Sequence, residues 1–329
     1  MNAMRKLAAL GVAATLATAA MPASATDELV VTHYGALLYG VPYAVAIDKG
    51  WFKKAGLAIE QPISSKGGST SVRNMMAGNT IYGEVALPAA LAALKEGIPI
   101  RIINVGTEGE GGYYISRTGE KMTDCPDLKG KRLGFTRPRS VTESMNLTLL
   151  RECGLKPEDV KMVATGDIAG GVVALENNQV DIVQISEPVY ARRIKDGKKY
   201  QIVDWASKKL PTFTQTVGIA TVDNIEKQGG KLQKVIDIRK RGVEFMYANQ
   251  AEAARITAKV YDQPADVMAM ALKGVNSINP KWWNADTFDM KAMNNMAQAL
   301  DSIGILKLPI DWKASMDLRF MPAAKRPQL

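Results

Sequence analysis

The sequence predicts an α/β protein of two lobes, each built from a mainly parallel sheet flanked by helices. Segments of strand and helix character alternate from residue 29 onward, and the same alternation restarts near residue 127. From residue 224 the pattern is helical to about residue 305. Alternating strands and helices are typical of parallel sheets covered on both faces. A chain of 329 residues is also long enough for about two domains.

The elements of the first half follow from apolar runs and from residues that begin or end helices. Pro42 suits the first turn of a helix over residues 42–54, and Gly56 suits the position just after its end. Ser69 or Thr70 can cap the next helix, and an Ala-rich helix follows the third strand. Short apolar runs predict the strands, at residues 29–32, 57–61, 81–86 and 100–105.

In the second half, as in the first, a turn is followed by a helix, a polar turn, a strand and a helix that begins with proline. Apolar runs predict its strands, at residues 132–136, 160–164, 180–185 and 217–221. Helices are predicted between these strands, at residues 141–151, through 172–175 and from Pro188 onward. The shared order indicates two lobes built alike.

The predicted first lobe takes residues 26–115 and 219–329, and the second lobe takes residues 116–218. Strand character stops before the C-terminal helices, so these helices are expected to pack back on the first lobe. The chain then crosses between the lobes twice, near residues 113–117 and 214–218. Two such crossings form a hinge.

Residues 1–25 have the features of a secretory signal peptide. Arg5-Lys6 is a charged start, residues 7–20 are apolar, and Ala23-Ser24-Ala25 is a small-residue cleavage site. No later run approaches the ~20 apolar residues of a membrane span. The mature protein is therefore expected to begin at Thr26, after cleavage behind Ala25, and to reach the periplasm of a bacterium.

Composition argues against several classes of function. The 42 Lys and Arg residues exceed the 33 Asp and Glu residues, but they are dispersed and lack interleaved aromatics. This pattern is typical of a solvated surface and predicts no nucleic-acid partner. The single His and the absence of a Cys-x-x-Cys motif argue against a metal site or a His-activated nucleophile. The sequence thus predicts a protein that is not an enzyme and has no cofactor, with His33 as a structural residue.

The two cysteines, Cys125 and Cys153, fall at one pole of the predicted second lobe. Cys125 precedes a strand that runs toward the expected cleft, and Cys153 follows the helix that runs back. An exported protein can keep a disulfide there. A disulfide and two free thiols both remain compatible with this placement.

A series of short motifs occurs in a characteristic order over residues 29–220. The motifs are Tyr34-Gly35, Ala46-Ile47-Asp48-Lys49-Gly50-Trp51-Phe52, Ala55-Gly56-Leu57, Gly67-Gly68-Ser69-Thr70, Asp127-Leu128-Lys129-Gly130-Lys131 and Ser186-Glu187-Pro188. Together they resemble the periplasmic substrate-binding proteins of ABC importers. The most similar group is the NMT1-like or SsuA/TauA-like one, which binds sulfonates, taurine, nitrate and thiamine-type pyrimidines.

The resemblance implies a type II-like periplasmic binding protein fold, with two lobes joined by a two-crossing hinge. It also implies that the lobes close on a small molecule and that the protein, as a monomer, then docks to an ABC permease in the inner membrane. The loop at residues 36–40 is more apolar than the corresponding loops of sulfonate-binding members, which argues against a sulfonate.

Ligands of open parallel sheets bind beyond the carboxyl ends of the strands, and this rule selects five places. The first is the loop that carries Tyr34, Leu37, Leu38 and Tyr39. A Tyr side chain can hold an organic ligand with a flat apolar face and a polar tip. The alternative is that Leu37 and Leu38 only seal the core.

The second place is Ser69 and Thr70, at the start of a helix whose free N–H groups suit an anion. The alternative is that the two residues only cap the helix.

The third place is Leu87 with the loop that carries Glu108 and Glu110. A carboxylate there would favour a ligand with a hydrogen-bond donor or a positive charge. The alternative is a flexible surface loop.

The fourth place is Arg137, Arg139 and Ser140, where a guanidinium can hold a carboxylate or sulfonate through two parallel hydrogen bonds. One of the two arginines can instead face solvent. The fifth place is Asp167 and Glu187, although Glu187 can equally cap the helix that follows it.

These features predict a solute-binding protein that captures a small organic ligand between its lobes for an importer. The arginines favour a carboxylate or sulfonate. The alternative ligand is a neutral or cationic heteroaromatic compound such as a pyrimidine, held by tyrosines among Tyr34, Tyr39, Tyr113 and Tyr114. Presentation of the ligand to a sensor also remains open. A pyrimidine-synthase activity is disfavoured, because such relatives carry a cysteine-rich motif and active-site histidines that this chain lacks.

Overall fold

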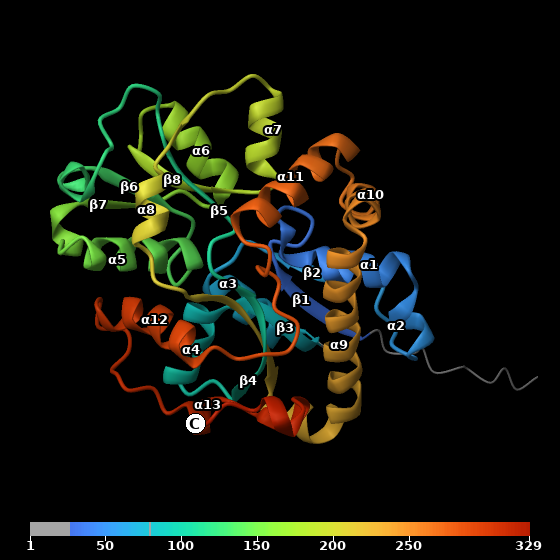
Figure 1. Cartoon of the computed structure of the whole chain (residues 1–329). Helices are drawn as coiled ribbons and strands as arrows, with labels where there is room; N and C mark the ends of the chain where they lie inside the picture. Colours follow the sequence, from blue (N-terminus) through green and yellow to red (C-terminus); the bar gives the residue numbers. More distant parts are fainter. Residues whose placement is uncertain (1–26, 79) are drawn as a thin grey trace, which may run out of the picture.

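The computed structural model describes residues 27–78 and 80–329, and the predicted signal peptide lies outside this part of the chain. Two five-stranded sheets form the centres of two lobes, with helices around them (Figure 1). The first sheet has the order β2-β1-β3-β10-β4, with β1 at Glu28–Thr32, β2 at Ile63–Ser65, β3 at Thr80–Ala86, β4 at Ile100–Glu108 and β10 at Thr214–Thr221. The second has the order β7-β6-β8-β5-β9, with β5 at Gly112–Ser116, β6 at Arg132–Phe135, β7 at Lys161–Ala164, β8 at Ile182–Ser186 and β9 at Gln201–Ile202.

The predicted two-lobed α/β class is confirmed, and both sheets are mixed rather than wholly parallel. In the first sheet β1 pairs in parallel with β2 and β3, whereas β10 is antiparallel to β3 and β4. In the second sheet β6 is parallel to β7 and β8, whereas β5 is antiparallel to β8 and β9. Each antiparallel strand, β5 or β10, is the strand that enters its lobe directly from the other lobe.

The sheet pairing also locates the two crossings between the lobes. The chain leaves the first sheet after β4 and enters the second at β5, so the first crossing is residues 109–111. It returns through residues 210–213, before β10. The boundaries predicted at residues 115 and 218 fall inside β5 and β10, because hydrogen bonding assigns each of these strands to the sheet it enters.

Thirteen α-helices cover the sheets within the described residues. Those of the first lobe are α1 (Val41–Asp48), α2 (Trp51–Lys54), α3 (Ser69–Ala77) and α4 (Leu87–Lys95). Those of the second lobe are α5 (Val141–Glu152), α6 (Ile168–Glu176), α7 (Val189–Lys195) and α8 (Asp204–Lys209). The C-terminal helices are α9 (Val222–Ala248), α10 (Gln250–Val260), α11 (Ala265–Ile278), α12 (Met290–Asp301) and α13 (Trp312–Ser315).

Two predicted elements of the first lobe are wrong in detail. The helix expected over residues 42–54 is interrupted, because Gly50 has a left-handed φ of 65° and separates α1 from α2. The strand expected at residues 57–61 is absent. Leu57 and Ile59 are buried as their apolar character suggests, but pairing with β1 begins only at Ile63.

The C-terminal helices pack on the first lobe, as expected, and two of them also touch the second. The long helix α9 runs along the first sheet beside α1 (Figure 1). Helix α11 packs against α7, where Lys195 Nζ lies 2.5 Å from a carboxylate oxygen of Asp266. Helix α12 packs against α4 and α5, and Arg151 donates a 2.6 Å hydrogen bond to Gln298. Contacts of the C-terminal helices therefore join the lobes on two sides.

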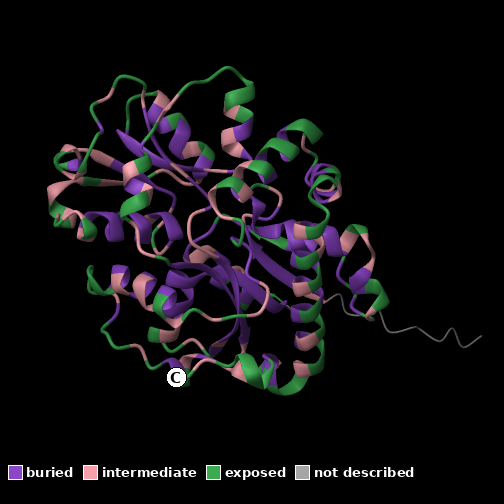
Figure 2. Ribbon diagram, in the orientation of Figure 1, coloured by how far each residue is buried: buried purple, intermediate pink, exposed green. Residues whose placement is uncertain are grey.

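Buried residues fill both lobes and the contact between them (Figure 2). The first lobe also contains a buried ion pair, in which Arg239 Nε donates to Glu84 Oε2 at 2.7 Å. The second lobe contains a disulfide between Cys125 and Cys153, with Cα atoms 5.3 Å apart. Among the described helices, none is long and apolar enough to cross a membrane.

Candidate ligand-binding site

A narrow cavity lies between the lobes, beyond the carboxyl ends of β1, β6 and β8. The first lobe contributes the loop after β1, Gly67 and Gly68 before α3, and Trp282. The second lobe contributes Thr136, the start of α5 and the end of β8. The first crossing forms the floor that joins them. The cavity volume is about 30 Å³, room for about two water molecules, so a larger ligand requires the lobes to part.

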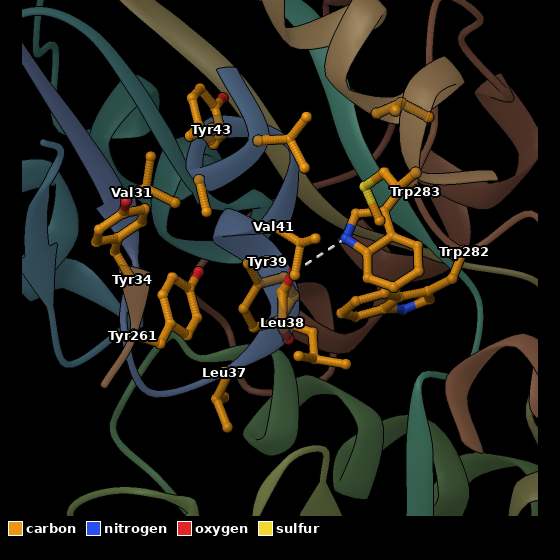
Figure 3. Packing of buried hydrophobic residues seen from close by; sticks show 14 of the residues in the cluster. Val31, Tyr34, Leu37, Leu38, Tyr39, Val41, Tyr43, Tyr261, Trp282 and Trp283 are labelled. Atoms are coloured by element: carbon orange, nitrogen blue, oxygen red, sulfur yellow. Dashed lines mark hydrogen bonds between the residues drawn. The ribbon is translucent and has the colours of Figure 1, made fainter. Parts of the chain in front are cut away.

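Two aromatic residues of the cavity wall, Tyr39 and Trp282, lie among the packed side chains of Figure 3. The Tyr39 and Trp282 ring centroids are 5.1 Å apart, and Trp282 packs edge-on against Trp283 at 4.9 Å. Tyr39 donates a 2.7 Å hydrogen bond to Gln215 Oε1, which holds the phenol in place, and burial raises its pKa above the usual range. Trp283 donates to the carbonyl of Leu38 at 3.0 Å. Hydrogen bonds and ring packing therefore hold the aromatic part of the wall in place.

Three buried polar atoms belong to residues of this wall and have no hydrogen-bond partner within the described part of the chain: Thr32 Oγ1, Glu110 Oε1 and Trp282 Nε1. Buried polar groups in native proteins are nearly always paired, and each exception calls for an explanation. One hydroxyl, one carboxyl oxygen and one indole N–H beside a cavity are the groups that a bound ligand would pair.

Burial also shifts the ionisation of two residues on the wall. It raises the pKa of Glu110 to about 8, although a hydrogen bond from Ser207 opposes the rise. It lowers the pKa of His33 to about 4; the nearby charge of Asp167 opposes this shift and that of Arg137 adds to it. At pH 7 the imidazole is therefore neutral and the Glu110 carboxyl is mostly protonated.

The wall from the second lobe is lined by hydroxyl groups. Thr136 and Thr142 hydroxyls lie 3.0 Å apart, and Ser140 lies 3.0 Å from Thr142. Ser140 also caps α5 by accepting a 3.2 Å hydrogen bond from the N–H of Glu143. Gln184 donates to the Tyr114 hydroxyl at 2.7 Å, which leaves its amide oxygen free to accept from a ligand.

Of the residues predicted for the first loop, Leu37 and Tyr39 lie on the cavity wall. Tyr34 lies behind it, edge-on to Tyr261 with ring centroids 5.2 Å apart. Leu38 is buried in the core, where its carbonyl accepts from Trp283. Leu87, from the third predicted place, is likewise fully buried, in a core cluster that also contains Val85 and Leu91.

The residues predicted for an anion come together, but in a separate groove. Ser69, Thr70, Arg137 and Arg139 line a space of about 780 Å³ on the outer side of the contact between the lobes. Arg139 pairs there with Glu96 at 2.6 Å, an ion pair between the lobes. Only Ser140, of the predicted arginine loop, reaches the cavity wall. Gly68 lines the cavity and Pro138 lines the groove, and a Cβ on Gly68 would lie 2.6 Å from the Pro138 carbonyl oxygen, so the two backbones approach closely there.

The remaining predicted acids form hydrogen bonds within the protein. Glu108 Oε2 accepts from Asn284 at 2.8 Å, and Asp167 caps α6 by accepting from the N–H of Gly170 at 2.8 Å. Glu187 accepts from the N–H of Ala191 at 2.9 Å, and burial raises its pKa to about 7. Glu187 therefore has the capping role that was the alternative to ligand contact.

The wall residues that sequence reasoning missed are of two kinds. Thr32 and His33 stand at the end of β1, but Thr32 was not selected and His33 was expected to be structural; Glu110 belongs to a loop that was selected, although Glu108 was the residue predicted to contact the ligand. Gln215 and Trp282 carry no such signal, because they belong to the returning strand and to a loop after α11. Only the folded chain brings them to the cleft.

Replacement of Gly68 by Ala is expected to hold the lobes apart. Gly68 has a φ of +56°, and a Cβ there would lie 2.6 Å from the carbonyl oxygen of Pro138 in the other lobe. Because backbone faces backbone, neither side can turn away. Small-angle X-ray scattering should give Gly68→Ala a larger radius of gyration than the wild type. Gly56→Ala, with a similar φ of +74° and open space around it, should match the wild type; equal radii for all three proteins would contradict this prediction.

Two lobes, a two-crossing hinge and a cavity at the strand ends define the class of two-lobed binding proteins. Within this class, the family model described as NMT1/THI5 like matches residues 39–253. The chain belongs to this family, and the family predicted from its motifs is confirmed.

Known proteins are similar to this chain at low sequence identity. A putative binding protein YtlA from Bacillus subtilis is 23% identical over 161 residues, and the match spans only about half of each chain, 48% of this one and 47% of the other. A 4-amino-5-hydroxymethyl-2-methylpyrimidine phosphate synthase from Aspergillus parasiticus is 25% identical over 243 residues, 69% of each chain.

Solved structures share the fold over most of their length. The periplasmic aliphatic sulphonate binding protein SsuA from Escherichia coli has a TM-score of 0.70 at 15% identity, with 92% of this chain and 96% of that chain covered. The periplasmic nitrate-binding protein NrtA from Synechocystis PCC 6803 has a TM-score of 0.64 at 15% identity, with 88% and 84% covered.

Proposed function

We propose that this protein is the periplasmic solute-binding component of an ABC importer. It captures a small organic ligand between its lobes and delivers it to a permease in the inner membrane. The observation that carries the proposal is the set of unpartnered buried polar atoms beside the interlobe cavity. The two crossings allow the lobes to part and close around a ligand. The named functions of SsuA and NrtA, which share the fold, support the same reading.

Binding is favoured over catalysis by the chemistry of the cavity wall. His33 is the only imidazole in the chain, and with a pKa near 4 it is a weak base at neutral pH. Both cysteines are held in the disulfide of the second lobe, away from the wall. Among the described residues, no group of His, Cys, Asp and Glu could hold a metal ion. A nucleophile paired with a base, the usual arrangement for group transfer, is thus missing from the described wall.

Export to the periplasm rests on the predicted signal peptide and is supported by the disulfide, because disulfides persist in oxidising compartments. Mass spectrometry of protein purified from the periplasm should give a chain that begins at Thr26. Retention of residues 1–25 in cytoplasmic protein would contradict export.

A thermal-shift screen of small metabolites tests the binding function directly. A ligand at a hundredfold excess over its Kd stabilises the folded protein by about 2.7 kcal/mol. At least one small organic compound should raise the melting temperature of the wild type, and Gly68→Ala should lose most of that rise because its lobes cannot close. A rise that is equal in both proteins would place the ligand outside the cavity and contradict the proposal.

A further inference from the structure

Glu187 lies where the second lobe meets helix α11. It stands between the end of β8 and the start of α7, and only 4% of the residue is exposed. One carboxyl oxygen, Oε2, accepts the 2.9 Å hydrogen bond from the N–H of Ala191 in α7. The other, Oε1, faces α11, because a Cβ on Gly274 of that helix would lie 2.7 Å from it. The carboxyl group is therefore enclosed between α7 and α11.

Helix α11 is part of the first lobe, so this contact joins the two lobes. It packs on α10, which packs on α1, and it meets the second lobe at α7 and β5 (Figure 1). The lobes are connected otherwise through the two crossings, about which they can turn. When the lobes part, α7 moves away from α11 and the Glu187 carboxyl becomes open to water.

The groups nearest to Glu187 are two phenols and a backbone amide. Tyr113 of β5 and Tyr190 of α7 have ring centroids 4.8 Å apart, and burial together with the nearby charge of Glu187 raises the pKa of both. Burial also raises the pKa of Glu187 to about 7, and the hydrogen bond from Ala191 only opposes this rise. A carboxylate at this contact is thus desolvated and has no cationic partner among the described residues.

The charged side chains of α7 and α11 do not compensate Glu187, because they are exposed or paired with other acids. Lys195 pairs with Asp266 at 2.5 Å, Arg193 lies 4.0 Å from Glu176, and Arg192 and Lys273 are exposed.

We propose that Glu187 makes lobe closure proton-linked: the closed form is stable while the Glu187 carboxyl is protonated, and its ionisation favours parting of the lobes. A protonated carboxyl fits between α7 and α11 as a neutral group. An ionised one is solvated better when the lobes are apart. The inference concerns closure itself and holds for whichever ligand the cavity binds.

The direction of the pH effect follows from the two environments of Glu187. Its pKa is about 7 in the closed protein, against 4.5 for an ordinary Glu in water. Closure therefore takes up a proton between these pH values, so the closed form is favoured at low pH and loses this advantage as the pH rises. The ratio of closed to open protein should fall on the order of 20-fold between pH 5.5 and pH 7.5. His33 stays neutral in this range, whereas Glu110 on the cavity wall also titrates and needs a comparison of variants.

Small-angle X-ray scattering of the mature protein without added ligand tests the inference. The radius of gyration of the wild type should increase between pH 5.5 and pH 7.5. Glu187→Gln, which is neutral at every pH and keeps the shape of the carboxyl, should lose most of this increase. Glu110 is present in both proteins, so its own contribution cancels from the comparison. Glu158→Gln, at an exposed position of the same lobe, is the matched control and should respond to pH as the wild type does.

A second measurement is the pKa of Glu187 itself, from the carbon NMR signal of labelled glutamate carboxyls that is missing in Glu187→Gln. It should be near 7 in the wild type. The inference is overturned if this signal titrates near 4.5, if the wild-type radius does not change with pH, or if Glu187→Gln keeps the whole change. None of these outcomes affects the binding function, which the metabolite screen tests separately.

Discussion

Replacement of Arg239 by Met is expected to lower the free energy of unfolding by about 3–5 kcal/mol, the usual cost of removing one partner from a buried ion pair. Arg239 and Glu84 have 1% and 0% of their side chains exposed. The guanidinium also donates to the carbonyls of Asn284 and Gly106, at 2.6 Å each. Met fills similar volume but leaves a buried carboxylate and two carbonyl groups without these donors.

In the Arg239→Met variant the Glu84 carboxylate keeps two weaker hydrogen-bond donors, and these limit the loss in free energy of unfolding. Tyr43 donates to it at 2.8 Å and Thr216 at 3.0 Å. Neither hydroxyl carries a positive charge, so both compensate the buried carboxylate only in part. The loss also reaches the segment after Trp282, because the Asn284 carbonyl accepts from Arg239, which also donates to the Gly106 carbonyl of β4.

Urea unfolding followed by tryptophan fluorescence measures the change. Arg241→Met is the matched control on the same helix, because Arg241 is exposed and stacks on Trp51 with its guanidinium carbon 4.0 Å from the ring centroid. An exposed cation–π contact contributes about 0.5–1 kcal/mol, so the control should lose no more. The prediction is contradicted if Arg239→Met is as stable as Arg241→Met. The double variant Glu84→Gln/Arg239→Met should recover part of the loss, since it removes the uncompensated charge.

Removal of the disulfide is expected to destabilise the second lobe by ~3–4 kcal/mol, from the loop-entropy relation for a closed loop of this size. The bond joins Cys125 and Cys153, which are 28 residues apart. It ties the turn before β6 to the C-terminal end of α5, at the pole of the lobe away from the cavity. Without the disulfide the unfolded chain has more conformational entropy, and folding has to remove this additional entropy.

The double variant Cys125→Ser/Cys153→Ser should melt at a lower temperature than the wild type. Dithiothreitol should lower the melting temperature of the wild type to a similar value and leave that of the variant unchanged. Ligand binding in the cavity should persist at 25 °C, because neither cysteine lies on the wall. Equal thiol titration of unfolded wild-type protein with and without reductant would show that no bond exists and defeat the prediction.

Local chemistry predicted most of the elements. Ser140 and Asp167, expected as ligand contacts, cap α5 and α6 by accepting hydrogen bonds from backbone N–H groups. The cap expected at Ser69 or Thr70 is wrong, because Gly68 is the N-cap of α3 and no side chain bonds there. Gly56 follows α2 in the left-handed conformation that ends a helix. The strand expected at residues 57–61 failed because burial of Leu57 and Ile59 is set by packing, whereas a strand needs a partner in register.

The candidate site was predictable only in part, because the strand-end rule finds a region and not the direction of a side chain. It selected Leu37, Tyr39 and Ser140, which line the cavity. It selected Arg137 and Arg139 with equal reason, yet these line the outer groove. The difference depends on how the two lobes meet, where Gly68 lines the cavity and Pro138 the groove, and no local pattern encodes the relative placement of the lobes.

By itself the sequence determined the α/β class, the two similar lobes, the family and the strand ends that meet at the cleft, since all of these follow from periodicity, caps and short motifs. Only the tertiary structure decided which side chains line the cavity. Glu110 and Trp282 are 172 residues apart in sequence and meet through the first crossing and a loop of the C-terminal region. Such a juxtaposition depends on long-range packing, which no local pattern in the sequence encodes.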